Sequence, residues 1–164
     1  MVLLPRDPRP ITYHPTNNNV ICSFINNEFV KGIDGKTFES INPSTEKPIV
    51  AVHEATEKDV DHAVSVARKT FESTWRHTTP DQRGRLLVKL ADLFEENLDI
   101  LASIESLDNG KALSMAKVDI GMCAGCLRYY GGWADKITGK VIETNPDTFS
   151  YTRQEPVSIL RPGN

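Results

Sequence analysis

The sequence predicts an α/β protein in which short strands lie at both ends and helices fill the middle. Three observations predict this arrangement. Before Thr56, short apolar runs are separated by turn residues, as in strands. After Thr56, apolar residues recur at the helical period of about 3.6. After Gly139, strand-like runs return around a single turn.

The first strands follow a segment, residues 1–19, that is rich in proline and asparagine and is expected to form a flexible arm without a core. Asn26-Asn27 and Asn42-Pro43-Ser44-Thr45 are typical turn sequences, and Pro43 has the fixed φ that suits a turn's second position. These turns and the glycines between them bound four predicted strands, at residues 20–24, 28–30, 37–41 and 49–53.

The helices are predicted from their end signals. Thr56 is a suitable N-cap for the first, and Thr79 begins the second with a capping box completed by Gln82. The third ends at Gly110, which favours a left-handed C-cap. The fourth is predicted over about 113–137, although each glycine inside it costs about 1 kcal/mol relative to alanine. We therefore expect another element to pack close to its backbone.

A β-hairpin is predicted after the helices. Residues 141–144 and 149–153 are strand-like, and Asn145-Pro146-Asp147 supplies the turn. An isolated hairpin is only marginally stable, so its free edges are expected to find a partner.

Composition excludes several classes of protein. Lys and Arg number 19 against 22 Asp and Glu, a net charge of −3, so there is no basic surface typical of nucleic-acid binders. No apolar run is long enough to span a membrane, and the N-terminal apolar run is too short for a signal peptide. Three cysteines are too few for a disulfide framework, which favours a cytoplasmic location.

The residues alone do not assemble an active site. Cys123-Ala124-Gly125-Cys126 has redox-motif spacing but lies within a predicted helix instead of opening one, so two ordinary buried or half-buried thiols are expected. The four histidines are scattered, whereas a zinc site needs about four ligands. Phosphate-binding loops of the GxGxxG or GxxxxGK[ST] type are absent from the sequence.

Several stretches between residues 24 and 157 resemble the N-terminal third of the NAD(P)-dependent aldehyde dehydrogenase superfamily, in particular its tetrameric class 1/2 type with its fungal members. They occur in the family's order and at its spacing: Phe24-Ile25-Asn26-Asn27-Glu28, Ile41-Asn42-Pro43-Ser44-Thr45, Arg83-Gly84-Arg85-Leu86-Leu87, Leu107-Asp108-Asn109-Gly110-Lys111, Leu127-Arg128-Tyr129-Tyr130-Gly131-Gly132-Trp133-Ala134-Asp135-Lys136 and Ser150-Tyr151-Thr152-Arg153-Gln154-Glu155-Pro156-Val157.

The resemblance implies an incomplete aldehyde dehydrogenase coenzyme-binding domain, with N-terminal strands and four helices over residues 20–139, plus one oligomerisation β-hairpin over 140–157. Residues 158–164 are interpreted as a tail outside the family pattern. The resemblance also implies a structural monovalent cation, bound by the backbone carbonyls of Ser40 and Ile41 and by Asp108. The alternative for Asp108 is an acid in a helix-terminal turn.

The family's nucleophilic Cys, general-base Glu, oxyanion-hole Asn, coenzyme-facing glycine motif and ribose-binding Lys all match positions beyond Val157. The resemblance therefore assigns no catalytic and no cofactor-binding residue here. It implies an N-terminal fragment of an enzyme that oxidises aldehydes to carboxylic acids with NAD or NADP. We expect the fragment to be inactive alone, to bind neither coenzyme, and to have exposed apolar faces where its sheet is missing.

Two other functions stay open. In one, the chain is a binding module that docks through its hairpin onto full-length aldehyde dehydrogenase subunits and modulates their assembly. In the other, it is an independent redox protein that uses Cys123 and Cys126.

Overall fold

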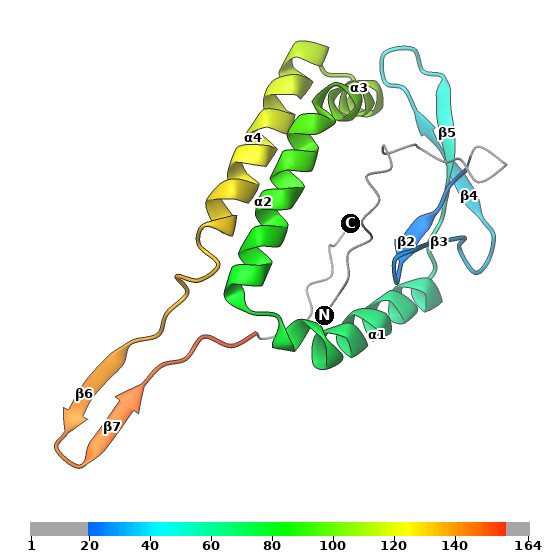
Figure 1. Ribbon diagram of the computed structural model, residues 1–164. Helices are drawn as coiled ribbons and strands as arrows, with labels where there is room; N and C mark the ends of the chain where they lie inside the picture. Colours follow the sequence, from blue (N-terminus) through cyan, green and yellow to red (C-terminus); the bar gives the residue numbers. More distant parts are fainter. Residues whose placement is uncertain (1–19, 157–164) are drawn as a thin grey trace.

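The computed structural model describes residues 20–156 and has strands first, then helices, then a hairpin, as the sequence predicts (Figure 1). The arm at 1–19 and the tail at 158–164 lie outside the described residues. The strands before the helices are β1 Val20–Ile21, β2 Ser23–Ile25, β3 Glu28–Val30, β4 Thr37–Ile41 and β5 Pro48–His53.

These strands form two small sheets. In one, β5 lies between β1, which is parallel to it, and β4, which is antiparallel. The other is a β2–β3 hairpin, whose turn residues Asn26 and Asn27 have φ values of 56° and 63°. Asparagine tolerates this left-handed conformation better than most residues. The strand predicted over 20–24 is thus wrong as a single element, because the chain leaves β1 at Cys22 and enters a different sheet.

Three helices follow the predicted end signals. The helix α1 (Glu57–Ser73) begins with a capping box between Thr56 and Asp59, and α2 (Pro80–Glu96) begins with one between Thr79 and Gln82. A short 3-10 turn, η1 (Trp75–His77), joins them. The helix α3 (Leu98–Asn109) ends at Gly110, whose φ of 79° gives the predicted left-handed C-cap.

The fourth helix, α4 (Leu113–Gly131), is shorter than predicted. The chain continues in turns after Gly131, where the N–H of Trp133 donates to the carbonyl of Tyr130 at 3.1 Å. A hydrogen bond between residues three positions apart is the 3-10 pattern, which is wound more tightly than an α-helix. Two consecutive glycines favour this ending, since each weakens a helix by about 1 kcal/mol. The Nζ of Lys136 then donates to the carbonyl of Gly132 at 2.5 Å.

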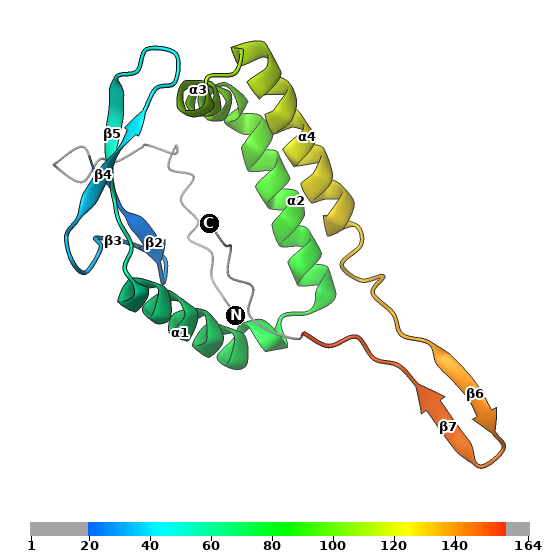
Figure 2. The ribbon, with the colours of Figure 1, turned by 180° about the vertical axis from the view of Figure 1, so that it is seen from behind.

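The helices α2 and α4 lie side by side in both ribbon views (Figures 1 and 2). They lie very close together at two glycines: a Cβ on Gly84 would lie 2.6 Å from the carbonyl oxygen of Gly131. The expected close approach to the backbone of the fourth helix therefore occurs at Gly131. At Gly121 and Gly125 no element of the described structure comes this close, since a Cβ would meet no atom within 4 Å there.

The tightly packed interior of the described residues is small. Its fully buried apolar side chains are four alanines of α2, α3 and α4: Ala91, Ala102, Ala116 and Ala124. Many larger apolar side chains are exposed instead, on the helices as well as on the strands. The exposed apolar faces expected from the sequence are present.

The predicted hairpin consists of β6 (Val141–Asn145) and β7 (Thr148–Tyr151) and extends away from the helices (Figures 1 and 2). At its base, the N–H of Thr152 donates to the carbonyl of Lys140 at 2.8 Å. Within the described residues, β6 and β7 pair only with each other. Apolar side chains of the hairpin are open to solvent, among them Phe149, which is 76% exposed.

Candidate functional site

The predicted cation ligands lie where β4 meets the end of α3. The hydroxyl of Ser40 donates to the Oδ1 of Asp108 at 3.0 Å, although 68 positions separate them in the sequence. The structure therefore brings Ser40 and Asp108 together, as the resemblance implies, and Ile41 follows Ser40 at the end of β4.

The local sequence explains why these elements meet. After β4, the side chain of Asn42 accepts a hydrogen bond from the N–H of Ser44 at 2.8 Å, which closes the Asn42-Pro43-Ser44-Thr45 turn. The ring of Pro43 packs against Gly110, where an added Cβ would lie 2.8 Å from the Pro43 Cγ. A glycine is required at this C-cap both for its positive φ and for this close contact.

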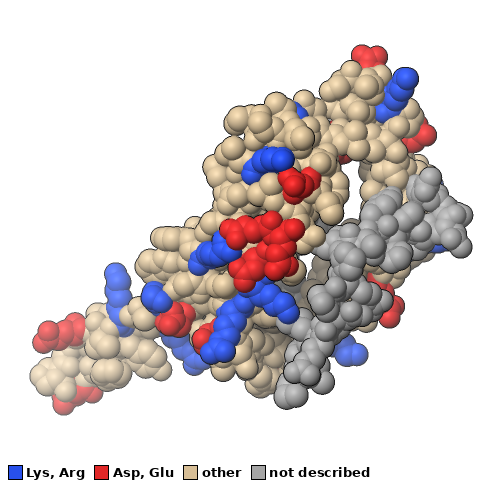
Figure 3. Space-filling view, turned by 45° about the horizontal axis from the view of Figure 1, so that its top comes forward, with Lys and Arg blue, Asp and Glu red and all other residues tan. Residues whose placement is uncertain are grey.

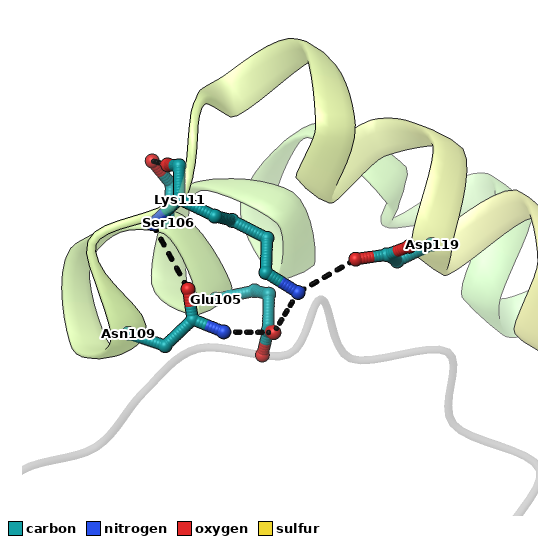
Figure 4. A network of polar contacts seen from close by, with 5 residues as sticks. All are labelled: Glu105, Ser106, Asn109, Lys111 and Asp119. Atoms are coloured by element: carbon teal, nitrogen blue, oxygen red, sulfur yellow. Dashed lines mark hydrogen bonds and ion pairs between the residues drawn. The ribbon is translucent and has the colours of Figure 1, made fainter.

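A polar network ties the same end of α3 to α4 (Figure 4). The Nζ of Lys111 lies 2.9 Å from Glu105 and 2.6 Å from Asp119, and Asn109 donates to Glu105 at 2.8 Å. The hydrogen bond to Asp119 raises the pKa of Lys111 most, and the one to Glu105 raises it further. The Ser106 hydroxyl donates to the carbonyl of Lys111 at 2.7 Å, so both the main chain and the side chain of Lys111 are held. The sequence places Lys111 in a family motif, but helical spacing joins only Glu105 and Asn109, so the contacts of Lys111 with Glu105 and Asp119 could not be predicted.

The oxygen-rich junction of β4 and α3 fits a hard monovalent cation in its donor chemistry. Asp108 supplies a carboxylate, and β4 is an edge strand, so backbone carbonyls on its outer side have no sheet partner among the described strands. Among the described residues, no three His, Cys, Asp or Glu side chains cluster as a metal site. A site at this junction would therefore depend on backbone oxygens, as predicted.

A second polar contact joins α2 to α4. The guanidinium of Arg128 pairs with Glu95 and lies 2.7 Å from Asp92, which raises the pKa of Arg128 and lowers that of Glu95. Acidic and basic side chains also lie next to one another near the middle of the face in Figure 3. The acidic side chains near the middle of this face form one group, and basic side chains border it.

The two cysteines of the redox-like motif lie within the fourth helix, as predicted, but their burial differs from the prediction. Cys123 and Cys126 are both exposed on α4, so the expectation of two buried or half-buried thiols is wrong. The buried residues of α4 are Ala116 and Ala124, with Ile120 and Leu127 half-buried, so Cys123 and Cys126 lie beside the packed face and not within it.

The described surface includes two grooves that bear on the site. One, of about 470 Å³, lies between α2 and the end of α4 and is lined by charged side chains and glycines. The other, of about 660 Å³, lies between α1 and the β2–β3 turn and has a largely apolar lining that includes Phe71 and Trp75. Neither groove is lined by a cysteine or a histidine. Neither therefore holds the thiol of a covalent catalytic site. None of the described helices is long and apolar enough to cross a membrane.

Comparison with known proteins decides the family. Residues 29–161 match the aldehyde dehydrogenase family, over a stretch that runs past Val157. The chain belongs to the aldehyde dehydrogenase family. The aldehyde dehydrogenase of Davidiella tassiana is 70% identical over 136 residues, which are 83% of this chain and 27% of that protein. The mitochondrial aldehyde dehydrogenase of Homo sapiens is 49% identical over 145 residues, 85% of this chain and 28% of that protein.

The fold agrees with the family. An aldehyde dehydrogenase from Bacillus cereus, solved as an NAD⁺ complex, superposes with a TM-score of 0.81 at 49% identity, over 84% of this chain and 28% of that one. The predicted fold class, part of an aldehyde dehydrogenase coenzyme-binding domain, is confirmed. The chain spans little more than a quarter of the length of these relatives.

Proposed function

We propose that these residues form the N-terminal part of the coenzyme-binding domain of an aldehyde dehydrogenase that oxidises an aldehyde to a carboxylic acid with NAD or NADP. The observation that carries this proposal is the joint match of sequence and fold to family enzymes, one of them solved with NAD⁺. A cytoplasmic location belongs to the same proposal, supported by the small number of cysteines.

The 164 residues taken alone are inactive in this proposal and bind neither coenzyme. Support comes from the two grooves, whose linings include no cysteine or histidine. The reaction needs a thiolate, an oxyanion hole and a base around the nicotinamide. The described residues instead supply helices that would pack beside the main sheet of the coenzyme-binding domain. A cation bound at Ser40, Ile41 and Asp108 would hold β4 against α3.

Complementation between two chains tests this proposal. The 164 residues are co-expressed with the part of the Davidiella tassiana enzyme that lies beyond the matched segment, and NAD(P)H formation from an aldehyde is followed. The matched control replaces them with that enzyme's own N-terminal segment. We expect activity from both pairs and none from the 164 residues alone. Activity from the control pair only, or from the 164 residues alone, would contradict the proposal.

The exposed hairpin favours a second candidate function, in which the chain docks onto full-length aldehyde dehydrogenase subunits and modulates their assembly. Co-purification with such a subunit tests it. Phe149→Lys on β7 is expected to abolish the complex. Phe29→Lys, at an exposed phenylalanine on β3, is the matched control and is expected to retain it. Equal binding by both variants would show that the hairpin is not the docking element.

A further inference from the structure

Asn109-Gly110 is the one asparagine–glycine pair in the sequence, and it lies at the C-terminal end of α3. The side-chain amide of an asparagine is open to attack by the backbone nitrogen of the next residue. Glycine obstructs this attack least, because it has no Cβ. The aldehyde oxidation proposed above does not use the Asn109 side chain, and the cation junction uses its neighbour Asp108.

Both polar atoms of the Asn109 side chain are held (Figure 4). Its Nδ2 donates to the Oε1 of Glu105 at 2.8 Å, and its Oδ1 accepts from the N–H of Lys111 at 2.9 Å. The same Glu105 oxygen lies 2.9 Å from the Nζ of Lys111, which also lies 2.6 Å from Asp119. Apart from the one to Asp119, these contacts join near neighbours in the sequence. They therefore do not depend on the segments that the relatives have beyond this chain.

The attacking nitrogen is held as well. The N–H of Gly110 donates to the carbonyl of Ser106 at 3.0 Å, at the C-cap of α3. This nitrogen attacks only after it loses its proton, so the hydrogen bond to Ser106 must open first. The end of a helix opens locally at a lower free energy than the whole fold. The contacts of Asn109 with Glu105 and Lys111 stabilise the closed turn and so lower the fraction of molecules that react.

We propose that Asn109 is a deamidation site whose rate is set by the opening of the last turn of α3. In the open turn, hydroxide takes the proton of the Gly110 nitrogen, this nitrogen bonds to the Cγ of Asn109, and the bond from Cγ to Nδ2 breaks. Nδ2 leaves as ammonia after taking a proton from water, and a cyclic succinimide remains. Water then opens the ring to aspartate or isoaspartate. In sum, water is consumed and ammonia is released, without oxidation or reduction.

Either product weakens the junction between α3 and β4. The new carboxylate replaces the Nδ2 donor and lies one helical turn from the carboxylate of Glu105, and like charges at this spacing are destabilising. Isoaspartate also adds a carbon to the main chain just before Gly110, where an added Cβ would lie 2.8 Å from the Cγ of Pro43. We therefore expect deamidation to loosen the contact between Ser40 and Asp108.

Incubation of the full 164-residue chain at mildly alkaline pH tests the site, with peptide mass spectrometry and an isoaspartate methyltransferase assay as readouts. We expect both products at Asn109. Glu105→Ala removes the acceptor of Nδ2 and should speed the reaction by roughly 2–12-fold, the equivalent of one net hydrogen bond. Glu96→Ala, at an exposed position near the end of α2 and outside the network, is the matched control and should react at the wild-type rate.

The same measurement in urea separates the effect of the fold from that of the local sequence. Unfolded wild type should react faster than the native chain and at the same rate as unfolded Glu105→Ala, because no turn remains to be opened. Circular dichroism verifies that the variants keep their helices in the absence of urea. The proposal is overturned if Asn109 reacts as fast in the native chain as in the unfolded one, if it does not react in the native chain, or if native Glu105→Ala reacts no faster than Glu96→Ala.

Discussion

The contact between Gly84 and Gly131 leads to a quantitative prediction about stability. Replacing a glycine by alanine inside a helix normally stabilises it by about 1 kcal/mol. At Gly84 the new Cβ would lie 2.6 Å from a backbone oxygen of α4 and 3.3 Å from the Cβ of Ala134. Backbone cannot move aside as a flexible side chain can, so the two helices must separate.

Overpacking a well-packed contact typically costs about 1–3 kcal/mol, and a clash with backbone belongs near the upper end of that range. Subtracting the helix-propensity gain of about 1 kcal/mol leaves a net loss of about 2 kcal/mol for Gly84→Ala. For a domain of this size, such a loss lowers the melting temperature by roughly 4–8 °C.

Urea unfolding followed by circular dichroism measures the loss, and Gly121→Ala is the matched control. Gly121 lies inside α4, but a Cβ there would meet no atom within 4 Å in the described structure. We expect this control to gain up to about 1 kcal/mol from helix propensity alone. The reasoning is refuted if Gly84→Ala is as stable as wild type while Gly121→Ala shows its gain.

Three further predictions concern charged side chains. Hydrogen bonds from Thr56 and Ile33 lower the pKa of buried Asp59 below 3.8. The free energy of unfolding should therefore be larger for wild type than for Asp59→Asn at neutral pH. This difference should shrink as the pH falls below 3.8. Asp119 and Glu105 raise the pKa of Lys111 above 10.5. Wild type should therefore be more stable to unfolding than Lys111→Gln at neutral pH. The difference should disappear only as the pH rises above 10.5. Potassium chloride should raise the melting temperature more than choline chloride at equal ionic strength, and Asp108→Asn should remove the difference; an equal effect of both salts on wild type would contradict a cation at the β4–α3 junction.

The sequence predicted those elements whose ends carry a local signal. Thr56, Thr79 and Gly110 mark helix ends by hydrogen bonding or backbone conformation within a few residues, and each lies at the predicted boundary. The end of α4 was missed, since apolar spacing continues past Gly131 while two adjacent glycines change the backbone. The split between β1 and β2 was missed because sheet membership depends on distant partners.

The features of the candidate site could likewise be predicted only in part. The contact between Ser40 and Asp108 came from the family resemblance, since no spacing rule relates residues so far apart. The exposure of Cys123 was predicted wrongly, because the packed face of α4 centres on the small residues Ala116 and Ala124, which periodicity of the larger apolar residues does not indicate. The Lys111 network depends on the angle at which α3 meets α4, which periodicity within either helix does not specify.

The position of the Gly84–Gly131 contact also affects how far the hairpin reaches. This contact lies at the end of α4 from which the chain continues to β6 (Figure 1). The strand β6 alone is roughly 17 Å long, from five residues at about 3.3 Å each. If the linker transmits motion rigidly, a tilt of about 10° at the crossing displaces the hairpin tip by about 3 Å, more than half the spacing between neighbouring strands. The two glycines thus lie at the pivot of the hairpin, and a single methyl group at this crossing would move the hairpin tip relative to α2.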